Sequence, residues 1–277
     1  MTFGERLADA VETRGRLCVG IDPHPGLLDD WGCTDSAVGL ERFAMTALEA
    51  VVGIAAVVKP QSAFFERHGS AGIAVLERLV AACREQGTIV LLDVKRGDIG
   101  STVQAYAEAY LSAGSPLAVD AVTASPFLGV GSLDPLIDTA LANDAGVFLL
   151  ALTSNPEGPQ VQHAITRQGT TVAASVLQAV AARNAGSHGL GSVGAVVGAT
   201  VECPPDVSVD TLDVGGPVLV PGIGEQGGTV DDVRRIFGRA ARHVLPSSSR
   251  QVLRAGPDKH RLRDAALRAV ESFSKLG

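Results

Sequence analysis

Aromatic side chains are scarce in this chain of 277 residues: Phe, Tyr and Trp together make up 4% of it, and there is one Trp. Hydrophobic residues make up 46% and charged residues 19%, a balance that excludes intrinsic disorder. Because so few apolar residues are aromatic, we expect an aliphatic core of Val, Ile and Leu. A chain of this length can bury enough surface to fold without disulfides or structural metals.

Cysteine is also rare, and its spacing excludes two kinds of site. The four residues (Cys18, Cys33, Cys83 and Cys203) lie far apart and form no C-x-x-C pair. Both a structural zinc site and a disulfide framework are therefore excluded. We expect free thiols that are buried or half-buried.

The chain has no long apolar run and no basic stripe. No stretch of about 18 apolar residues is present, so no transmembrane helix is expected. The net charge is −7, which argues against nucleic-acid binding. The first residues, MTFGERLADAVETRGRL, lack the apolar stretch of a signal peptide and predict an amphipathic helix over 2–14. We expect a soluble cytoplasmic protein that binds neither nucleic acid nor membrane.

What is present is a regular alternation of two kinds of segment. Eight short apolar runs rich in β-branched residues occur at 17–22, 55–61, 88–95, 117–125, 146–154, 194–200, 217–224 and 243–249. Several are continuous rather than alternating, as in strands buried on both faces of a parallel sheet. Stretches of helical periodicity lie between them, at Ala37–Val52, Ile73–Gln86, Val103–Ser112, Val161–Arg183, Val230–Ala241 and Arg261–Lys275.

Eight strand–helix repeats predict a single (β/α)8 TIM barrel with eight parallel strands. No linker divides the chain, so one domain over 1–277 is expected, with the helix over 2–14 covering the bottom of the barrel. A doubly wound open sheet is the alternative. The absence of G-x-G-x-x-G after the first strand favours the closed barrel.

Polar residues gather at the carboxyl ends of the predicted strands, where barrel enzymes hold their active sites. They are Asp22, Lys59, Asp93, Lys95, Asp98, the run Thr153, Ser154 and Asn155, and the run Ser247 to Arg250. Strand periodicity places Asp93 and Lys95 on one face, inside the barrel, and Lys59 could join them. The alternative is an ion-pair network that only holds the strands in register. Arg96 should point the other way, toward a salt bridge outside the barrel or on the next helix.

A second cluster combines the glycine-rich run 221–228 with Arg250 at the next strand end. Loops after the seventh and eighth strands form the usual phosphate site of such barrels. Glycine lets backbone N–H groups approach an oxyanion, and Arg250 can clamp it with two hydrogen bonds. The alternative is two ordinary turns.

The motifs LLDVKRGDIGST, GIDPHP, VVKPQSAFFE, VTASPFLG, LTSNP and PGIGEQGG occur in an arrangement that resembles the orotidine 5′-phosphate decarboxylases, and most closely their longer, type 2 bacterial branch. The resemblance extends from Gly20 to Arg250. It implies decarboxylation of orotidine 5′-monophosphate to uridine 5′-monophosphate, the last step of de novo pyrimidine nucleotide synthesis. It also implies that no metal or organic cofactor is needed, and that a homodimer forms with active sites shared between subunits.

The resemblance also implies roles for single residues. Lys95 would donate a proton to C6 of the pyrimidine, and Asp93 would face the substrate carboxylate. Lys59 and Asp98 would complete the charge array, with Asp98, Ile99 and Thr102 reaching into the partner's site. The remaining substrate-binding residues would be Asp22 at the ribose, Ser154 at the pyrimidine, and Pro221, Gln226, Gly227 and Arg250 around the phosphate. Thr153 and Asn155 are equally polar neighbours of Ser154, and Glu225 must point away from a bound phosphate.

Three other functions remain open. A hexulose-phosphate synthase or ketogulonate-phosphate decarboxylase would share the Asp-x-Lys strand but would need a divalent metal, and so would be sensitive to EDTA. A Schiff-base aldolase using Lys59 or Lys95 would be trapped by borohydride, although nearby carboxylates raise a lysine pKa and so disfavour it. A nucleotide-binding protein without activity would have no need of Asp93, Lys95 and Asp98 together.

Overall fold

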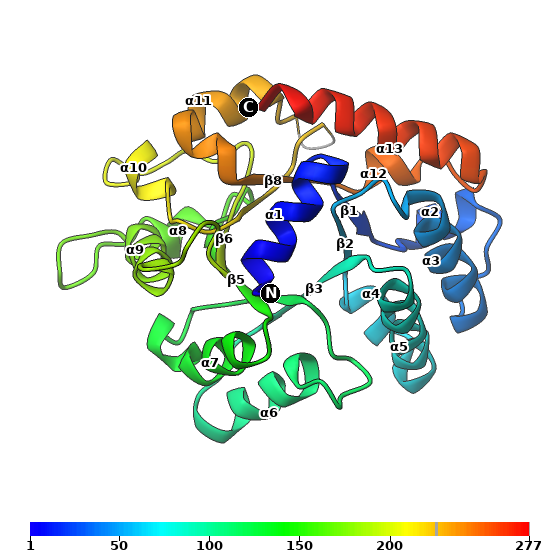
Figure 1. Cartoon of the computed structure of the whole chain (residues 1–277), viewed down its shortest axis with the longest axis horizontal. Coiled ribbons are helices and arrows are strands. Elements are labelled where there is room, and N and C mark those ends of the chain that lie inside the picture. Colours follow the sequence, from blue (N-terminus) through cyan, green and yellow to red (C-terminus); the bar gives the residue numbers. More distant parts are fainter. Residues whose placement is uncertain (225–226, 277) are drawn as a thin grey trace.

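The eight strands close into a parallel barrel in which each strand pairs with the next and β8 pairs with β1, in a computed structural model that describes residues 1–224 and 227–276 (Figure 1). The strands are β1 (Cys18–Ile21), β2 (Val57–Pro60), β3 (Ile89–Arg96), β4 (Ala121–Ala124), β5 (Gly146–Leu152), β6 (Val193–Val197), β7 (Val218–Pro221) and β8 (Val244–Ser248). This confirms the predicted (β/α)8 fold.

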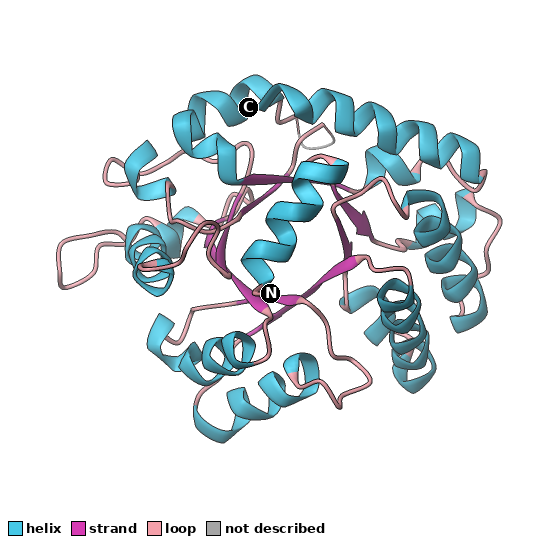
Figure 2. Ribbon diagram, viewed as in Figure 1, coloured by secondary structure: helices cyan, strands magenta, loops and turns pink. Residues whose placement is uncertain are grey.

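Helices surround the barrel on its outside (Figure 2). They are α2 (Pro25–Asp30), α3 (Ala37–Val51), α4 (Ala63–Glu66), α5 (Gly69–Glu85), α6 (Gly100–Leu111), α7 (Asp134–Ala142), α8 (Pro159–Gln162), α9 (Val172–Asn184), α10 (Val209–Leu212), α11 (Val230–Phe237), α12 (Arg250–Leu253) and α13 (Lys259–Phe273). Three short 3-10 helices, η1 (Val130–Leu133), η2 (Gly238–His243) and η3 (Ser274–Leu276), extend them. None of the described helices is long and apolar enough to cross a membrane.

One predicted helix is interrupted. The stretch 161–183 divides into α8 and α9, and the segment between them forms an isolated antiparallel bridge from Ile165 to Thr171. Gly169 takes a positive φ of 82°, which a continuing helix does not allow. The Thr171 side chain then caps α9 by accepting from the Ala174 N–H. The helical periodicity of the sequence was therefore right for α9 and wrong for the turn before it.

The first helix, α1 (Phe3–Arg14), lies across one end of the barrel (Figure 1). Its Phe3 and Leu7 are buried in a cluster with residues near the starts of the strands, among them Val57, Leu91 and Phe148. Phe3 and Phe148 meet edge to face with ring centroids 6.0 Å apart. This end of the barrel is therefore filled by apolar side chains, and the opposite end is left for polar residues.

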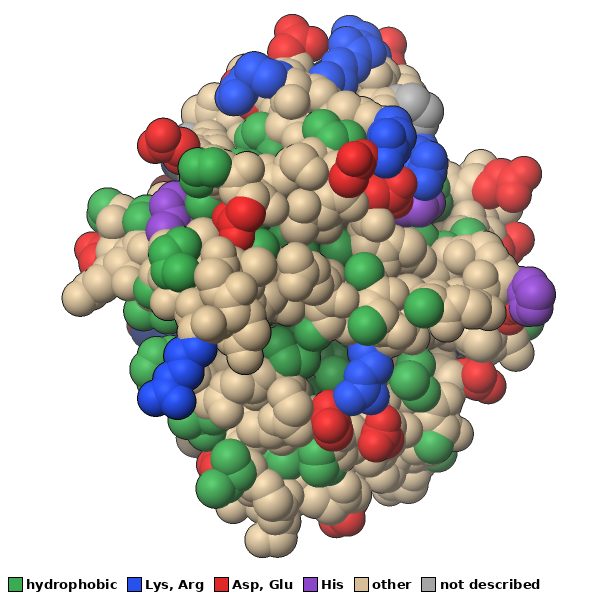
Figure 3. All heavy atoms as spheres, turned by 90° about the vertical axis from the view of Figure 1, so that its left-hand side faces the viewer, with side chains coloured by type: hydrophobic (Ala, Val, Ile, Leu, Met, Phe, Trp, Pro, Cys, Tyr) green, Lys and Arg blue, Asp and Glu red, His purple; other side chains and the backbone are tan. Residues whose placement is uncertain are grey.

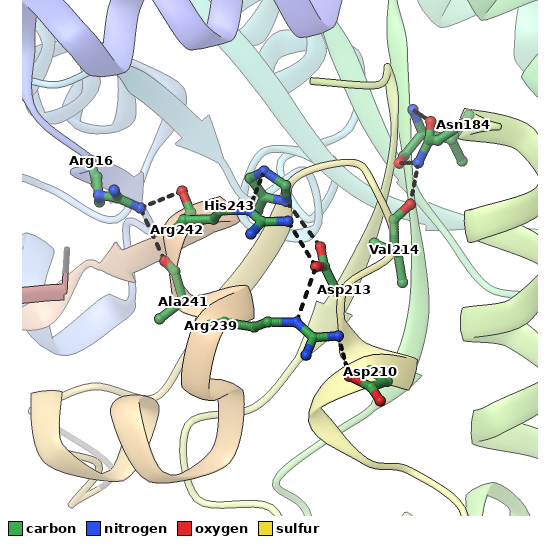
Figure 4. A network of polar contacts seen from close by, with 10 residues as sticks. Arg16, Asn184, Asp210, Asp213, Val214, Arg239, Ala241, Arg242 and His243 are labelled. Carbon is green, nitrogen blue, oxygen red and sulfur yellow. Dashed lines mark hydrogen bonds and ion pairs between the residues drawn. The ribbon is translucent and has the colours of Figure 1, made fainter. Parts of the chain in front are cut away.

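A polar network stabilises the segment before β7 (Figure 4). Asp213 accepts from Arg242 at 2.8 Å and lies 3.5 Å from Nδ1 of His243. Arg16 donates to the carbonyl oxygens of Ala241 and Arg242, at 3.0 and 2.6 Å. These contacts connect the loop after α10 to η2 and to the start of β1, far from the carboxyl ends of the strands.

The visible face carries charges of both signs, and the cysteines are free thiols, as predicted. On the side of the molecule shown in Figure 3, acidic and basic side chains are interspersed, with no basic stripe. All four cysteines are free; three are buried and Cys203 is half-buried. Burial raises the pKa of the Cys18 thiol to about 12, so it stays protonated at neutral pH.

Candidate active site

Polar residues continue the inward face of the barrel strands beyond its apolar layer. Strand residues two positions apart share a face, so Lys59 follows Val57, Asp93 follows Leu91, and Thr123 follows Ala121. The register pairs Gly20 with Lys59 and bridges Gln61 to Asp93, which brings β1, β2 and β3 together at this end. The apolar layer fills the barrel, and the polar layer lies next to it, toward the carboxyl ends of the strands.

The centre of this layer is a buried ion pair. The Lys59 ammonium donates to Oδ2 of Asp93 at 2.9 Å, and the two residues are 6% and 7% exposed. Removing two charges from water costs several kcal/mol, which only close pairing and further hydrogen bonds offset. Apolar residues of similar volume would often stabilise the core as well as this ion pair does. The pair is therefore weak evidence for a purely structural role.

Lys95 binds the second oxygen of the same carboxylate. Its ammonium donates to Oδ1 of Asp93 at 2.6 Å, while the side chain stays 44% exposed. The prediction that these two side chains share one face is correct, but regular strand alternation is not the reason. Lys95 has a φ of 45°, and the β3–β4 pairing shifts register between Leu92 and Arg96. A non-glycine residue in this region costs on the order of 1–2 kcal/mol, so the surroundings must hold it there.

Two residues that the sequence analysis did not single out complete this arrangement. Thr123 on β4, 1% exposed, donates its hydroxyl to Oδ1 of Asp93 at 2.8 Å and accepts the Lys95 N–H at 3.0 Å. The Gln61 amide, oriented to satisfy both neighbours, donates to the Asp93 carbonyl and accepts from the Lys95 ammonium at 3.3 Å. Thr123 could have been found from the sequence, because it is a threonine on the inward face of an otherwise apolar strand.

Mutual charge determines the protonation of the pair. Burial opposes the charge of Lys59, but Asp93 and Asp22 outweigh it and raise the Lys59 pKa above its ordinary value. Burial likewise opposes ionisation of Asp93, but Lys59 and Lys95 hold its pKa well below the usual range. Both groups are therefore charged at neutral pH. A raised pKa also makes the Lys59 amine a poor nucleophile, which disfavours Schiff-base chemistry there.

A small cavity beside Lys59 brings together four of the predicted site residues. Its volume is about 140 Å³, and it is lined by Asp22, His24, Lys59, Pro221, Gly222, Ile223, Ser247, Ser249 and Arg250. Oδ1 of Asp22 and Oγ of Ser249 are buried and have no hydrogen-bond partner among the described residues. A Cβ atom on Gly20 would lie 2.8 Å from Cβ of Ser249, so glycine is needed there. Buried polar atoms without partners are typical of a site that a ligand completes.

A larger pocket of about 520 Å³ is lined by Lys95. Its lining is mostly apolar and includes Pro126, Phe127 and Leu150 together with Thr153 and Asn155. These two polar side chains bond within their own loop, since Thr153 donates to Asn155 at 2.6 Å and Asn155 donates to Glu157 at 3.0 Å. Ser154 between them is exposed, and its Cβ would be 3.3 Å from a Cβ placed on Gly198.

Three predicted residues are not brought to the ion pair within this chain. Asp98 accepts the Ile99 N–H at 2.8 Å, and the Thr102 N–H donates to the Ile99 carbonyl at 3.2 Å. In the described part of the chain, none of their side chains bonds to Lys59, Asp93 or Lys95. Ile99 is 61% exposed.

Described residues on both sides of positions 225 and 226 of the glycine-rich run bond to one another. Gly222, Gly224 and Gly227 have positive φ, and the Gly227 N–H donates to the Gly224 carbonyl at 3.0 Å. Gln226 and Glu225 lie outside the described residues. Arg96 forms the expected salt bridge outside the barrel, donating to Glu66 of α4 at 2.6 Å. Across 1–224 and 227–276, no three His, Cys, Asp or Glu side chains gather so that they could hold a metal ion.

Comparison with known proteins shows the family to which the chain is similar. The model of the family described as Orotidine 5′-phosphate decarboxylase / HUMPS family matches residues 15–265. Two proteins named orotidine 5′-phosphate decarboxylase are similar over nearly their whole length. The one from Nocardioides sp. is 59% identical over 274 residues, covering 98% of each chain. The one from Salinispora arenicola is 58% identical over 269 residues, covering 97% of this chain and 96% of that protein.

A crystal structure shows the same likeness in three dimensions. A candidate orotidine 5′-phosphate decarboxylase from Streptomyces avermitilis superposes with a TM-score of 0.94 at 54% identity, covering 99% of this chain and 95% of that one. With the match over 15–265, this means that the chain belongs to the orotidine 5′-phosphate decarboxylase / HUMPS family.

Proposed function

We propose that this protein decarboxylates orotidine 5′-monophosphate to uridine 5′-monophosphate and carbon dioxide, the last step of de novo pyrimidine nucleotide synthesis. The observation that carries the proposal is the Lys95 ammonium at the open mouth, held 2.6 Å from the buried Asp93 carboxylate. Loss of carbon dioxide from C6 leaves an electron pair with no easy sink. A preorganised cation stabilises charge that develops only in the transition state.

Lys95 then supplies the proton. The bond from C6 to the carboxylate breaks, its electron pair stays on C6, and carbon dioxide leaves. One Nζ proton of Lys95 moves to C6 and forms the new C–H bond. The neutral amine recovers a proton from water, which reaches the half-exposed side chain. Asp93 faces the leaving carboxylate, and the like charges destabilise bound substrate relative to the transition state.

The rest of the substrate extends from Lys95 toward the cavity of about 140 Å³. Asp22 and Lys59 would hold ribose hydroxyls, and the unpaired Oδ1 of Asp22 is suited to accept one of them. Arg250, with Pro221, Gln226 and Gly227, would hold the phosphate. Ser154 would bind the pyrimidine edge. The reaction needs no metal or organic cofactor, since the lysine supplies both charge and proton.

We also propose a homodimer with shared sites. Asp98, Ile99 and Thr102 would enter the partner's site, where Asp98 completes the charge array. The exposed Ile99, Phe127 and Leu128, at 61%, 76% and 52%, follow the carboxyl ends of β3 and β4 and would be covered by the partner. A cytoplasmic location stays a prediction from the sequence.

The test is the ultraviolet absorbance of orotidine 5′-monophosphate mixed with purified protein in excess EDTA. A falling absorbance with uridine 5′-monophosphate as product supports the reaction, the substrate and independence from metals together. No change with folded protein would overturn the proposal. Activity that returns only with magnesium and a sugar phosphate would assign the chain to the metal-dependent branch of its family.

A further inference from the structure

We infer that Thr123 is a positioning residue for the decarboxylation: its hydroxyl fixes both the Asp93 carboxylate and the backbone that carries Lys95. The inference rests on the proposed function. Thr123 lines neither the cavity beside Lys59 nor the larger pocket that Lys95 lines. It therefore acts through Asp93 and Lys95, the two residues to which it bonds.

The hydrogen bonds around Thr123 can be assigned completely. A carboxylate only accepts and a backbone N–H only donates, so the single hydroxyl proton goes to Oδ1 of Asp93 at 2.8 Å. A lone pair of the same oxygen accepts the Lys95 N–H at 3.0 Å. The Asp93 carboxylate then has a separate partner on each side: Lys59 on Oδ2, and Lys95 with Thr123 on Oδ1. These donors hold the plane of the carboxylate in a single orientation.

The backbone explains why a hydroxyl is needed at this position. β3 and β4 pair regularly at Leu92 and Val122 and resume at Arg96 and Ala124, so the bulge removes Lys95 from the ladder. The Lys95 N–H would be left without a partner there, and the Thr123 side chain supplies one. The same bond helps hold Lys95 at its φ of 45°, which points its ammonium back to Asp93.

Replacing Thr123 by valine keeps the shape and removes the hydroxyl. Asp93 then loses one donor, and the Lys95 N–H loses its acceptor. We expect kcat to fall roughly 10- to 100-fold, as for loss of a hydrogen bond to a charged group, with a much smaller change in KM. We also expect the acid limb of the kcat profile to move to higher pH, because a carboxylate with fewer donors binds a proton more readily.

The chain offers a matched control at the other end of β3. Thr88 is also buried, 4% exposed, and its hydroxyl has no hydrogen-bond partner among the described residues. Thr88→Val should therefore leave kcat, KM and the pH profile as in the unmodified protein. The test compares Thr123→Val, Thr123→Ser and Thr88→Val by steady-state kinetics across pH and by thermal unfolding.

The inference holds if Thr123→Val lowers kcat and moves the acid limb while Thr123→Ser restores both. It is overturned if Thr123→Val keeps the kcat and acid limb of the unmodified enzyme, or if kcat and KM deteriorate together with no movement of the limb. If the valine variant does not fold, Thr123→Ala against Thr123→Ser isolates the same hydroxyl and is judged by the same results. An unmodified protein that leaves orotidine 5′-monophosphate unchanged would instead overturn the proposed function.

Discussion

Lys59 and Asp93 form a 2.9 Å ion pair between two neighbouring strands, although the residues are only 6% and 7% exposed. The pair is coupled to Lys95 through the second carboxylate oxygen and to Thr123 through a hydroxyl. Three groups donate to this one carboxylate, so several testable properties of the protein depend on its charge and orientation.

Lys95→Ala should abolish turnover while uridine 5′-monophosphate still binds. The ammonium is the proposed stabiliser and proton donor, and loss of general-acid catalysis alone costs about 10²- to 10⁴-fold. The affinity for uridine 5′-monophosphate should change little, because the proposed ribose and phosphate contacts lie in the separate cavity beside Lys59. Calorimetric titration with uridine 5′-monophosphate, beside the absorbance assay, checks both statements. Near-normal turnover would remove Lys95 from the proposed role.

Lys59→Met and Asp93→Asn should each destabilise the fold by about 3 kcal/mol or more, because each leaves a buried charge without its partner. The loss should be larger for Asp93→Asn. In Lys59→Met, the Asp93 carboxylate keeps its bonds to Lys95 and Thr123. In Asp93→Asn, the buried Lys59 ammonium loses the carboxylate to which it donates. Urea unfolding of both variants and of the double variant measures this. The double variant should cost less than the sum by about 0.5–3 kcal/mol; strict additivity would mean that the pair is not coupled.

The same pair predicts a stability plateau with two limits. The Asp93 pKa is lowered on folding, so its contribution is present above the unfolded carboxyl value near 4 and is lost as the pH falls toward the folded value. The Lys59 pKa is raised on folding, so its contribution is present below the unfolded lysine value of about 10.4 and is lost at higher pH. Denaturant unfolding from acidic to basic pH measures both limits. Subtracting the profile of Lys59→Met/Asp93→Asn removes the other titrating groups, and a difference that does not depend on pH would contradict the assignment.

Mixing two inactive variants should restore activity if sites are shared. Lys95→Ala and Asp98→Asn are each expected to be inactive as homodimers. In a heterodimer one site takes its lysine and its aspartate from unmodified positions, so equal mixing after subunit exchange should recover about a quarter of the sites. Activity of the mixture against each variant alone is the measurement. No recovery, with subunit exchange shown independently, would place Asp98 outside the partner's site.

Local signals in the sequence were sufficient for the architecture. The spacing of eight apolar runs predicted eight strands and a closed barrel, because a strand buried on both faces must be apolar throughout. The polar residues that interrupt those runs, Lys59, Asp93 and Lys95, were visible for the same reason. A charge at the end of a buried strand is expensive, so it stands out from its neighbours in the sequence.

Tertiary structure alone decided how those residues are held. The bulge before Arg96, the left-handed Lys95 and the hydroxyl of Thr123 arise from the register between β3 and β4, which no local pattern encodes. The break between α8 and α9 also escaped the helical periodicity. Barrel closure likewise decided that Asp22, Lys59 and Arg250 line one cavity although they are far apart in the chain. Periodicity follows from local backbone geometry, whereas register and closure follow from contacts between residues distant in sequence, and it is these contacts that orient the charges of the site.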